Sequence, residues 1–217
     1  MVYIGTSGFS YDDWKGPFYP EDTDKKDMLA HYCRQFGAVE INSTYYAIPS
    51  RSTFLSLARK TPAEFKFSVK AYKEMTHVEV HSPDVFQQFL DALAPLVDSG
   101  KLGCILAQFP WSFKRTAQNQ ERLEAFKDAM GNMPTVVEFR NSEWVVAETF
   151  DLLRELDLGF CCVDEPALRG LMPRVSAATS PVAYVRFHGR NAQNWWKHEE
   201  AWQRYDYLYT EQELAYT

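Results

Sequence analysis

The stretch VVEFRNSEW, from Val136 to Trp144, ends an apolar run with two opposite charges, Glu138 and Arg140. Side chains two residues apart on a strand lie on the same face, and an unpaired charge on a buried strand is costly. The two residues are therefore either a structural ion pair or part of a working site. In such a site the carboxylate can transfer a proton while the guanidinium holds an anion.

Polar residues close the other strand-like runs in the same way. They are Gly5, Thr6 and Ser7, then Glu40 and Asn42, Ser68 and Lys70, Gln108, Asp164, and finally Arg186 and His188. In a parallel barrel, the carboxyl ends of all strands face one pocket, where barrel enzymes place their chemistry. We expect Glu138 to act as general acid/base with Glu40 or Asp164, because acids and bases in one pocket shift each other's pKa values. The alternative is an ion-pair network that only neutralises the barrel mouth.

These strand ends give a predicted site. The expected catalytic residues are Glu138, Glu40, Asp164 and His188, and the expected substrate-binding residues are Arg140, Arg186, Lys70, Asn42, Gln108, Trp14 and Tyr45. Planar guanidinium groups match carboxylate and phosphate geometry, so the expected ligand is a small anion. Trp14 belongs to GTSGFSYDDWKGPFYP, which is expected at the pocket rim, and structural packing explains its aromatic residues equally well.

The segment VRFHGRNAQNWWKH (185–198) carries cations, two histidines and two tryptophans but no acid. The loop after the seventh strand of a barrel commonly helps to bind phosphate. Trp195 and Trp196 can stack on a base or sugar ring. In the alternative interpretation, one tryptophan belongs to the core and the other covers a helix.

Metal binding is a weaker interpretation. HVEVH (77–81) alternates His, Glu and His, a pattern that can hold a metal but that short surface sequences produce by chance. The acids of the strand ends and His188 are also metal-ligand types. The cations Lys70, Arg140 and Arg186 would repel a divalent ion at the same mouth. We assign no metal ligand and no cofactor, and keep a divalent metal as an alternative.

Strand-like and helix-like segments alternate along the chain. The strand-like runs are VYIG, AVEIN, FKFSVK, LGCILAQF, TVVEFR, GFCCVD and AYVRFH; the helical segments between them are KKDMLAHYCRQFG, RSTFLSLARK, PDVFQQFLDALAPLVDSG, NQERLEAFKDAMG and VVAETFDLLRELDLG. The connection 165–182 shows no clear helix. This pattern predicts an α/β protein with a parallel sheet covered on both faces, and polar groups at every strand end favour a (β/α)₈ TIM-barrel-like fold over an open sheet. We expect one domain, 1–217, with seven strands visible and the C-terminal helix and last strand missing.

Composition excludes several classes. The 217 residues are 46% hydrophobic and 24% charged, as in a folded globular chain, and the net charge of −6 disfavours nucleic acid and anionic membranes as partners. The N-terminus does not read as a signal peptide, and no segment has the apolar length of a membrane span. The four cysteines read as core residues rather than disulfides or metal ligands. We expect a cytoplasmic protein.

Several motifs together resemble a known family. IGTSGFSYDDWKGPFYP, VEINSTYY, FKFSVKA, MTH, LAQFP, VEFRNSEW, VRFHGRN and YDYLY resemble, in order, motifs of the domain-of-unknown-function 72 family (YecE-like proteins). The resemblance covers nearly the whole chain. It implies a TIM-barrel-like fold, no established activity, and a last helix and strand after YDYLY.

Three functions follow from these residues. The first is an enzyme of hydrolase or isomerase/lyase type that acts on a small phosphorylated or carboxylated metabolite. The second is a nucleic-acid-processing enzyme, whose binding would weaken steeply with salt. The third is a non-catalytic protein that binds a metabolite and reports to a partner. The sequence leaves the substrate and the oligomeric state open.

Overall fold

The computed structural model describes residues 1–79, 82 and 84–215, which belong to two compact units, Met1–Leu106 and Ala107–Thr217. Seven strands follow one another in chain order from β1 to β7, and helices occupy each connection except the one from β6 to β7. This is the strand order of a β/α barrel, and it confirms the predicted TIM-barrel-like α/β class. Within residues 1–79, 82 and 84–215, no strand follows β7.

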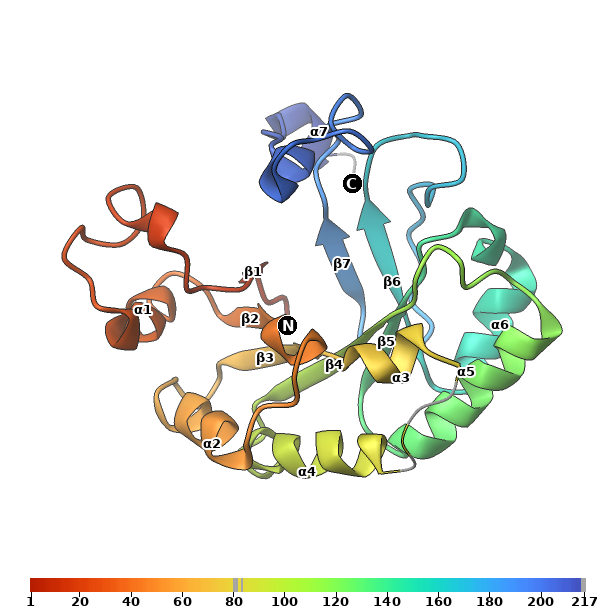
Figure 1. Cartoon of the computed structure of the whole chain (residues 1–217), viewed down its shortest axis with the longest axis horizontal. Coiled ribbons are helices and arrows are strands. Elements are labelled where there is room, and N and C mark those ends of the chain that lie inside the picture. Colours follow the sequence, from red (N-terminus) through yellow and green to blue (C-terminus); the bar gives the residue numbers. More distant parts are fainter. Residues whose placement is uncertain (80–81, 83, 216–217) are drawn as a thin grey trace. The chain divides into compact units, whose positions relative to one another are not determined.

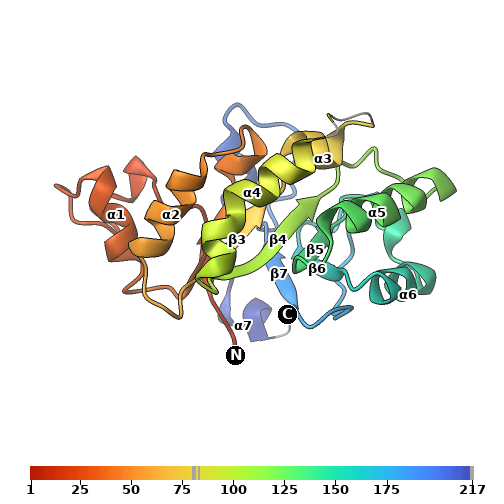
Figure 2. The ribbon, with the colours of Figure 1, turned by 90° about the horizontal axis from the view of Figure 1, so that it is seen from below.

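The first unit is built on parallel strand pairs. Its strands are β1 (Gly5–Ser7), β2 (Ala38–Ile41), β3 (Lys66–Lys70) and the start of β4 (Leu102–Gln108), each paired in parallel with the next. Its helices are α1 (Lys25–Tyr32), α2 (Arg51–Arg59), α3 (Lys73–His77) and α4 (Val85–Asp98), with the short 3-10 helices η1 (Asp12–Trp14) and η2 (Ser43–Tyr45). α2 and α4 lie side by side along the outside of β3 (Figures 1 and 2).

The first strand begins later than the run VYIG predicts. β1 starts at Gly5, and Val2 and Ile4 are exposed. A Cβ at Gly5 would lie 2.0 Å from the carbonyl oxygen of Ala38, so glycine permits the close approach of β1 to β2. The hydrophobic residues before Gly5 therefore do not form the strand.

The second unit holds the parallel strands β5 (Thr135–Glu138), β6 (Gly159–Asp164) and β7 (Tyr184–Phe187). Its helices are α5 (Ala117–Met130), α6 (Ala147–Glu155) and α7 (Glu211–Ala215), with the 3-10 helices η3 (Ser142–Trp144) and η4 (Ala201–Tyr205). The connection from β6 to β7 contains no helix, as predicted. The arrowheads of β6 and β7 point toward the end where α7 lies (Figure 1).

Burial differs among these strands. Every residue of β5 is buried, as the near-continuous apolar pattern predicts. On β7, by contrast, Val185 and Phe187 are 51% and 49% exposed, while Arg186 between them is part-buried. Arg186 therefore points away from the solvent, whereas Val185 and Phe187 point toward it.

Aromatic packing fixes the segment that follows β5. The rings of Phe139 and Trp144 stack with centroids 4.4 Å apart, and the Trp144 indole donates to the Phe113 carbonyl at 2.6 Å. The Asn141 side chain accepts from the Glu143 amide at 3.0 Å and so begins η3. Arg140 therefore lies between two residues that are held in place, Phe139 by ring stacking and Asn141 by its hydrogen bond.

Candidate functional site

Glu138, the last residue of β5, is fully buried at the centre of a charged cluster in the second unit. Arg140 Nε lies 2.6 Å from Glu138 Oε1, and Arg186 Nη1 donates to Glu138 Oε2 at 2.5 Å. His188 Nε2 lies 3.4 Å from Glu138 Oε1. Three of the predicted site residues therefore meet around the carboxylate of a fourth, Glu138.

The sheet explains how these residues meet. Glu138 and Arg140 are two residues apart at the end of β5, and Arg186 and His188 have the same spacing at the end of β7, so each pair shares one face. β6 lies between β5 and β7 and pairs with both. Two strand spacings are about 10 Å, a gap that the side chains of Arg186 and Glu138 bridge by extending toward each other.

Glu138 has the properties of a fixed anion. Burial raises the pKa of its carboxyl group, but Arg140, Arg186 and His188 together outweigh burial and hold this pKa well below the usual value. A carboxylate with so low a pKa is a weak base near neutral pH. Glu138 therefore fits the role of holding the cations better than the predicted role of general acid/base.

His188 is a neutral group in this cluster near pH 7. It is 7% exposed. Burial lowers the pKa of its imidazole, and the nearby arginines lower it further, while Glu138 opposes them. A neutral imidazole keeps one nitrogen as a donor and the other as an acceptor, which suits a hydrogen-bonding role at the site.

Glu165 is a residue of this cluster that was not predicted from the sequence. It is 4% exposed, and its Oε1 accepts from the Met172 amide at 2.8 Å. Oε2 lies 3.6 Å from Arg140 Nη1 and accepts no hydrogen bond from any residue that the structure describes. Burial raises the pKa of this carboxyl group, and the Glu138 charge adds to the rise, although Arg140 and other groups oppose them. The signal in the sequence that could have found Glu165 is the pair of acids, Asp164 and Glu165, after the run GFCCV. Adjacent residues of a strand point to opposite faces, so the two acids have different surroundings.

Asp164, in contrast, is engaged in a bidentate ion pair. Arg190 Nε donates to Oδ1 at 2.7 Å and Arg190 Nη2 donates to Oδ2 at 2.6 Å. The Tyr209 hydroxyl donates to Oδ1 at 2.9 Å. Burial raises the pKa of Asp164, but these donors outweigh it and lower the pKa overall. Its contacts favour a structural role over the predicted partnership with Glu138 in proton transfer.

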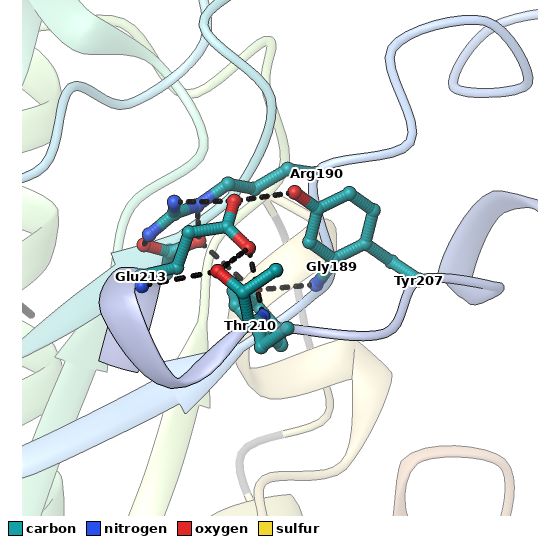
Figure 3. A network of polar contacts seen from close by, with 7 residues as sticks. Gly189, Arg190, Tyr207, Thr210 and Glu213 are labelled. Carbon is teal, nitrogen blue, oxygen red and sulfur yellow. Dashed lines mark hydrogen bonds and ion pairs between the residues drawn. The ribbon is translucent and has the colours of Figure 1, made fainter. Parts of the chain in front are cut away.

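The same network ties the segment before α7 to the end of β7 (Figure 3). Arg190 Nη1 donates to Glu213 Oε1 at 3.0 Å, and the Tyr207 hydroxyl donates to the same oxygen at 2.5 Å. Glu213 Oε2 accepts from the amide of Thr210 at 2.9 Å. The Gly189 amide donates to the Tyr209 hydroxyl at 3.0 Å. The motif YDYLY therefore anchors the backbone directly after His188.

The predicted residues of β1 and β2 form a second cluster, in the first unit. Glu40 is 5% exposed and accepts from the Ser7 hydroxyl at 2.9 Å. The Asn42 side-chain amide donates to the same hydroxyl, and the Tyr11 hydroxyl donates to the Ser7 carbonyl. Burial, followed by the charge of Glu40, raises the pKa of Tyr11. Polar side chains thus meet at the end of β1 and β2, as predicted for strand ends.

The other predicted residues have mixed surroundings. Lys70 Nζ lies 4.6 Å from the centre of the Tyr45 ring, a cation–π geometry. Trp14 packs edge-on against Phe18 with centroids 5.4 Å apart, which supports its structural interpretation. Gln108 ends β4 and is part-buried. Whether the residues of both units line one pocket stays a prediction.

The surface grooves found in the first unit contain none of the predicted site residues. One, of about 360 Å³, lies between α2 and α4 and includes Arg51 and Lys101. Another, of about 290 Å³, lies beside α1 and includes His31.

The described residues offer no metal centre. No group of three or more His, Cys, Asp or Glu side chains among residues 1–79, 82 and 84–215 has the geometry to hold a metal ion. At Glu138, Oε1 lies 2.6 Å from Arg140 Nε and 3.4 Å from His188 Nε2, so a guanidinium already stands where a metal ion would bind this oxygen. In HVEVH, Val80 and His81 lie outside the described residues, so that interpretation stays a prediction.

No helix among the described residues has both the length and the apolar character that a membrane crossing requires.

Comparison with known proteins identifies related chains. The chain is similar to the UPF0759 protein YunF of Bacillus subtilis (strain 168), with 34% identity over 230 residues that cover 99% of this chain and 80% of YunF. A crystal structure of a DUF72 family protein from Thermotoga maritima MSB8 superposes with a TM-score of 0.91 and 43% identity, and covers 100% of this chain and 84% of that one. The crystal structure of a DUF72 family protein from Enterococcus faecalis V583 superposes with a TM-score of 0.88 and 28% identity. The match covers 99% of this chain and 81% of that one.

The family model described as "Protein of unknown function DUF72" matches residues 3–216. This match and the similarity over the full chain confirm the family that the sequence motifs resemble. The chain belongs to the DUF72 family.

Proposed function

We propose that the second unit binds a small phosphorylated or carboxylated metabolite at Arg140 and Arg186 and transfers a proton through Glu165. One observation carries the proposal. Both arginines pair with the buried carboxylate of Glu138, and 17% of the Arg140 side chain and 12% of the Arg186 side chain remain exposed. The exposed parts of two planar guanidinium groups that lie on one carboxylate can together donate hydrogen bonds to a bound phosphate or carboxylate.

Glu165 is the better acid/base candidate because its pKa is raised. An anion bound at Arg140 would weaken the favourable effect of that guanidinium on the Glu165 carboxylate, since Arg140 Nη1 is 3.6 Å from Oε2. Binding is then expected to raise the pKa of Glu165 further and to favour its protonated form. A buried carboxylic acid beside a bound anion is a suitable proton donor.

Anion binding can be measured by isothermal titration calorimetry with inorganic phosphate, methyl phosphate and oxalate. Arg140→Lys keeps the charge but loses the planar fork, and we expect about 10-fold or greater weakening of binding. Arg154→Lys is the matched control, because Arg154 lies on α6, 54% exposed and paired with Asp151. Equal loss in both variants, or no binding to the wild-type protein, would contradict the proposal.

The role of Glu165 has its own test. Titration in buffers of different ionisation enthalpy measures the protons taken up on binding. We expect proton uptake by the wild-type protein and none by Glu165→Gln, with anion binding retained in the variant. Unchanged uptake in Glu165→Gln would assign the proton to another group.

A further inference from the structure

An exposed aromatic ring stands beside the charged cluster. The Tyr205 ring lies 6.3 Å from the imidazole of His188, between centroids, and Tyr205 is 48% exposed. His188 itself is 7% exposed and lies 3.4 Å from Glu138 Oε1. Tyr205 is therefore an accessible ring at the boundary of the proposed anion site.

The segment that carries Tyr205 is held firmly in place. The Asn191 side-chain amide donates to the carbonyl oxygens of Gln203 at 3.1 Å and Asp206 at 3.0 Å. These two carbonyls lie on either side of Tyr205 in the chain. Backbone that is already fixed in place loses little conformational freedom when a ligand packs against the side chain that it carries.

A buried tryptophan and a further cation support the same ring. Trp195 is 2% exposed, and its ring centroid lies 6.4 Å from that of Tyr205. Arg204 donates to the Trp195 carbonyl at 2.9 Å, and its guanidinium lies 5.3 Å from the centre of the Trp195 ring. The charge of Arg204 also lowers the pKa of Glu165.

From this juxtaposition we infer that the anion bound by the cluster carries a planar ring, and that Tyr205 is the residue that selects it. The ligand class is an aryl or heteroaryl phosphate or carboxylate, with its charged group at Arg140 and Arg186 and its ring against Tyr205. This inference rests on the proposed anion site. Aromatic side chains accept any flat ring on their faces, so the selection is for ring shape rather than for one base or substituent.

Matched ligands test the inference by calorimetry. Phenyl phosphate and methyl phosphate carry the same charged group and differ in the ring. We expect the wild-type protein to bind phenyl phosphate more tightly by about 5- to 150-fold, the range for stacking on one aromatic side chain. Tyr205→Ala should remove this preference, so that the variant binds the two phosphates with the same affinity, whereas Tyr205→Phe should retain the preference. Trp202→Ala is the control, because Trp202 lies on the same helix η4 and is 62% exposed.

The outcomes separate the two proposals. If the wild-type protein binds both phosphates equally and Arg140→Lys weakens both, the anion site stands and the ring inference fails. If neither phosphate binds, the proposed function itself fails. If Trp202→Ala removes the ring preference and Tyr205→Ala does not, our assignment of Tyr205 is wrong.

Discussion

Replacing the charge of Glu138 should destabilise the protein strongly. In Glu138→Gln, the guanidinium groups of Arg140 and Arg186 lose the buried negative charge whose oxygens lie 2.6 and 2.5 Å from them. Breaking a buried ion pair by removing one partner costs about 3–5 kcal/mol. We therefore expect a loss of about this size in the free energy of unfolding near neutral pH.

The loss should depend on pH in a defined direction. The pKa of Glu138 is held well below its ordinary value of 4.5. A depressed carboxyl pKa contributes stability that is fully present above the unfolded-state pKa and is lost as the pH falls through the folded-state pKa. The difference between wild type and Glu138→Gln should therefore be largest near neutral pH and shrink in acid.

Urea unfolding followed by tryptophan fluorescence measures this difference. Glu143→Gln is a control from the same sequence stretch, because Glu143 forms an ion pair at 3.5 Å with Lys114 in which the side chains are 50% and 46% exposed. An exposed pair of this kind contributes about 0–1 kcal/mol. If Glu138→Gln costs no more than Glu143→Gln near neutral pH, the charged cluster is not held together as we argue.

Four further substitutions have expected outcomes in the same unfolding assay. Glu165→Gln should stabilise the protein at about pH 7 and not at about pH 4, because a raised carboxyl pKa costs stability only where the wild-type group must ionise. Gly189→Ala should cost about 2–4 kcal/mol, since φ is +80° and the new Cβ would lie 2.9 Å from a neighbouring Cβ. Gly100→Ala, at a left-handed helix end with φ of +67° and nothing within 4 Å of the new Cβ, should cost about 1 kcal/mol; equal costs would contradict the steric argument. Lys101→Met should cost about 2–4 kcal/mol, because the buried ammonium donates to the carbonyl oxygen of Ala58 in α2 and to the carbonyl and hydroxyl oxygens of Thr61; a neutral result would mean that these groups find other donors.

Local pattern was sufficient to predict most elements. The predicted strand-like runs of five to eight residues contain β2 to β7, and the connection 165–182 lacks a helix, as its irregular composition indicates. The exception is the first strand, where VYIG is more apolar than the true strand Gly5–Ser7. Close approach to Ala38 decides that strand, and a contact between residues distant in the chain leaves no local pattern.

The predicted site shows the same division. Strand-end alternation predicted the meeting of Glu138, Arg140, Arg186 and His188, because two-residue spacing fixes which side chains share a face. It did not predict the role of each. From the sequence, Glu138 and Asp164 cannot be distinguished from any other acid at a strand end. The protonation of each group depends on its burial and on the cations that surround it.

The sequence by itself determined the family, the β/α order and the set of charged residues at the strand ends, since these depend on composition and on spacing along one strand. Tertiary structure alone decided that Glu138 is a fixed anion, that Asp164 is held by Arg190 and Tyr209, and that Glu165 lies beside Arg140. The physical reason is the steep dependence of electrostatic energy on distance and burial. Residues 26 and 45 positions from Asp164 set its state, and their approach exists only in the folded chain.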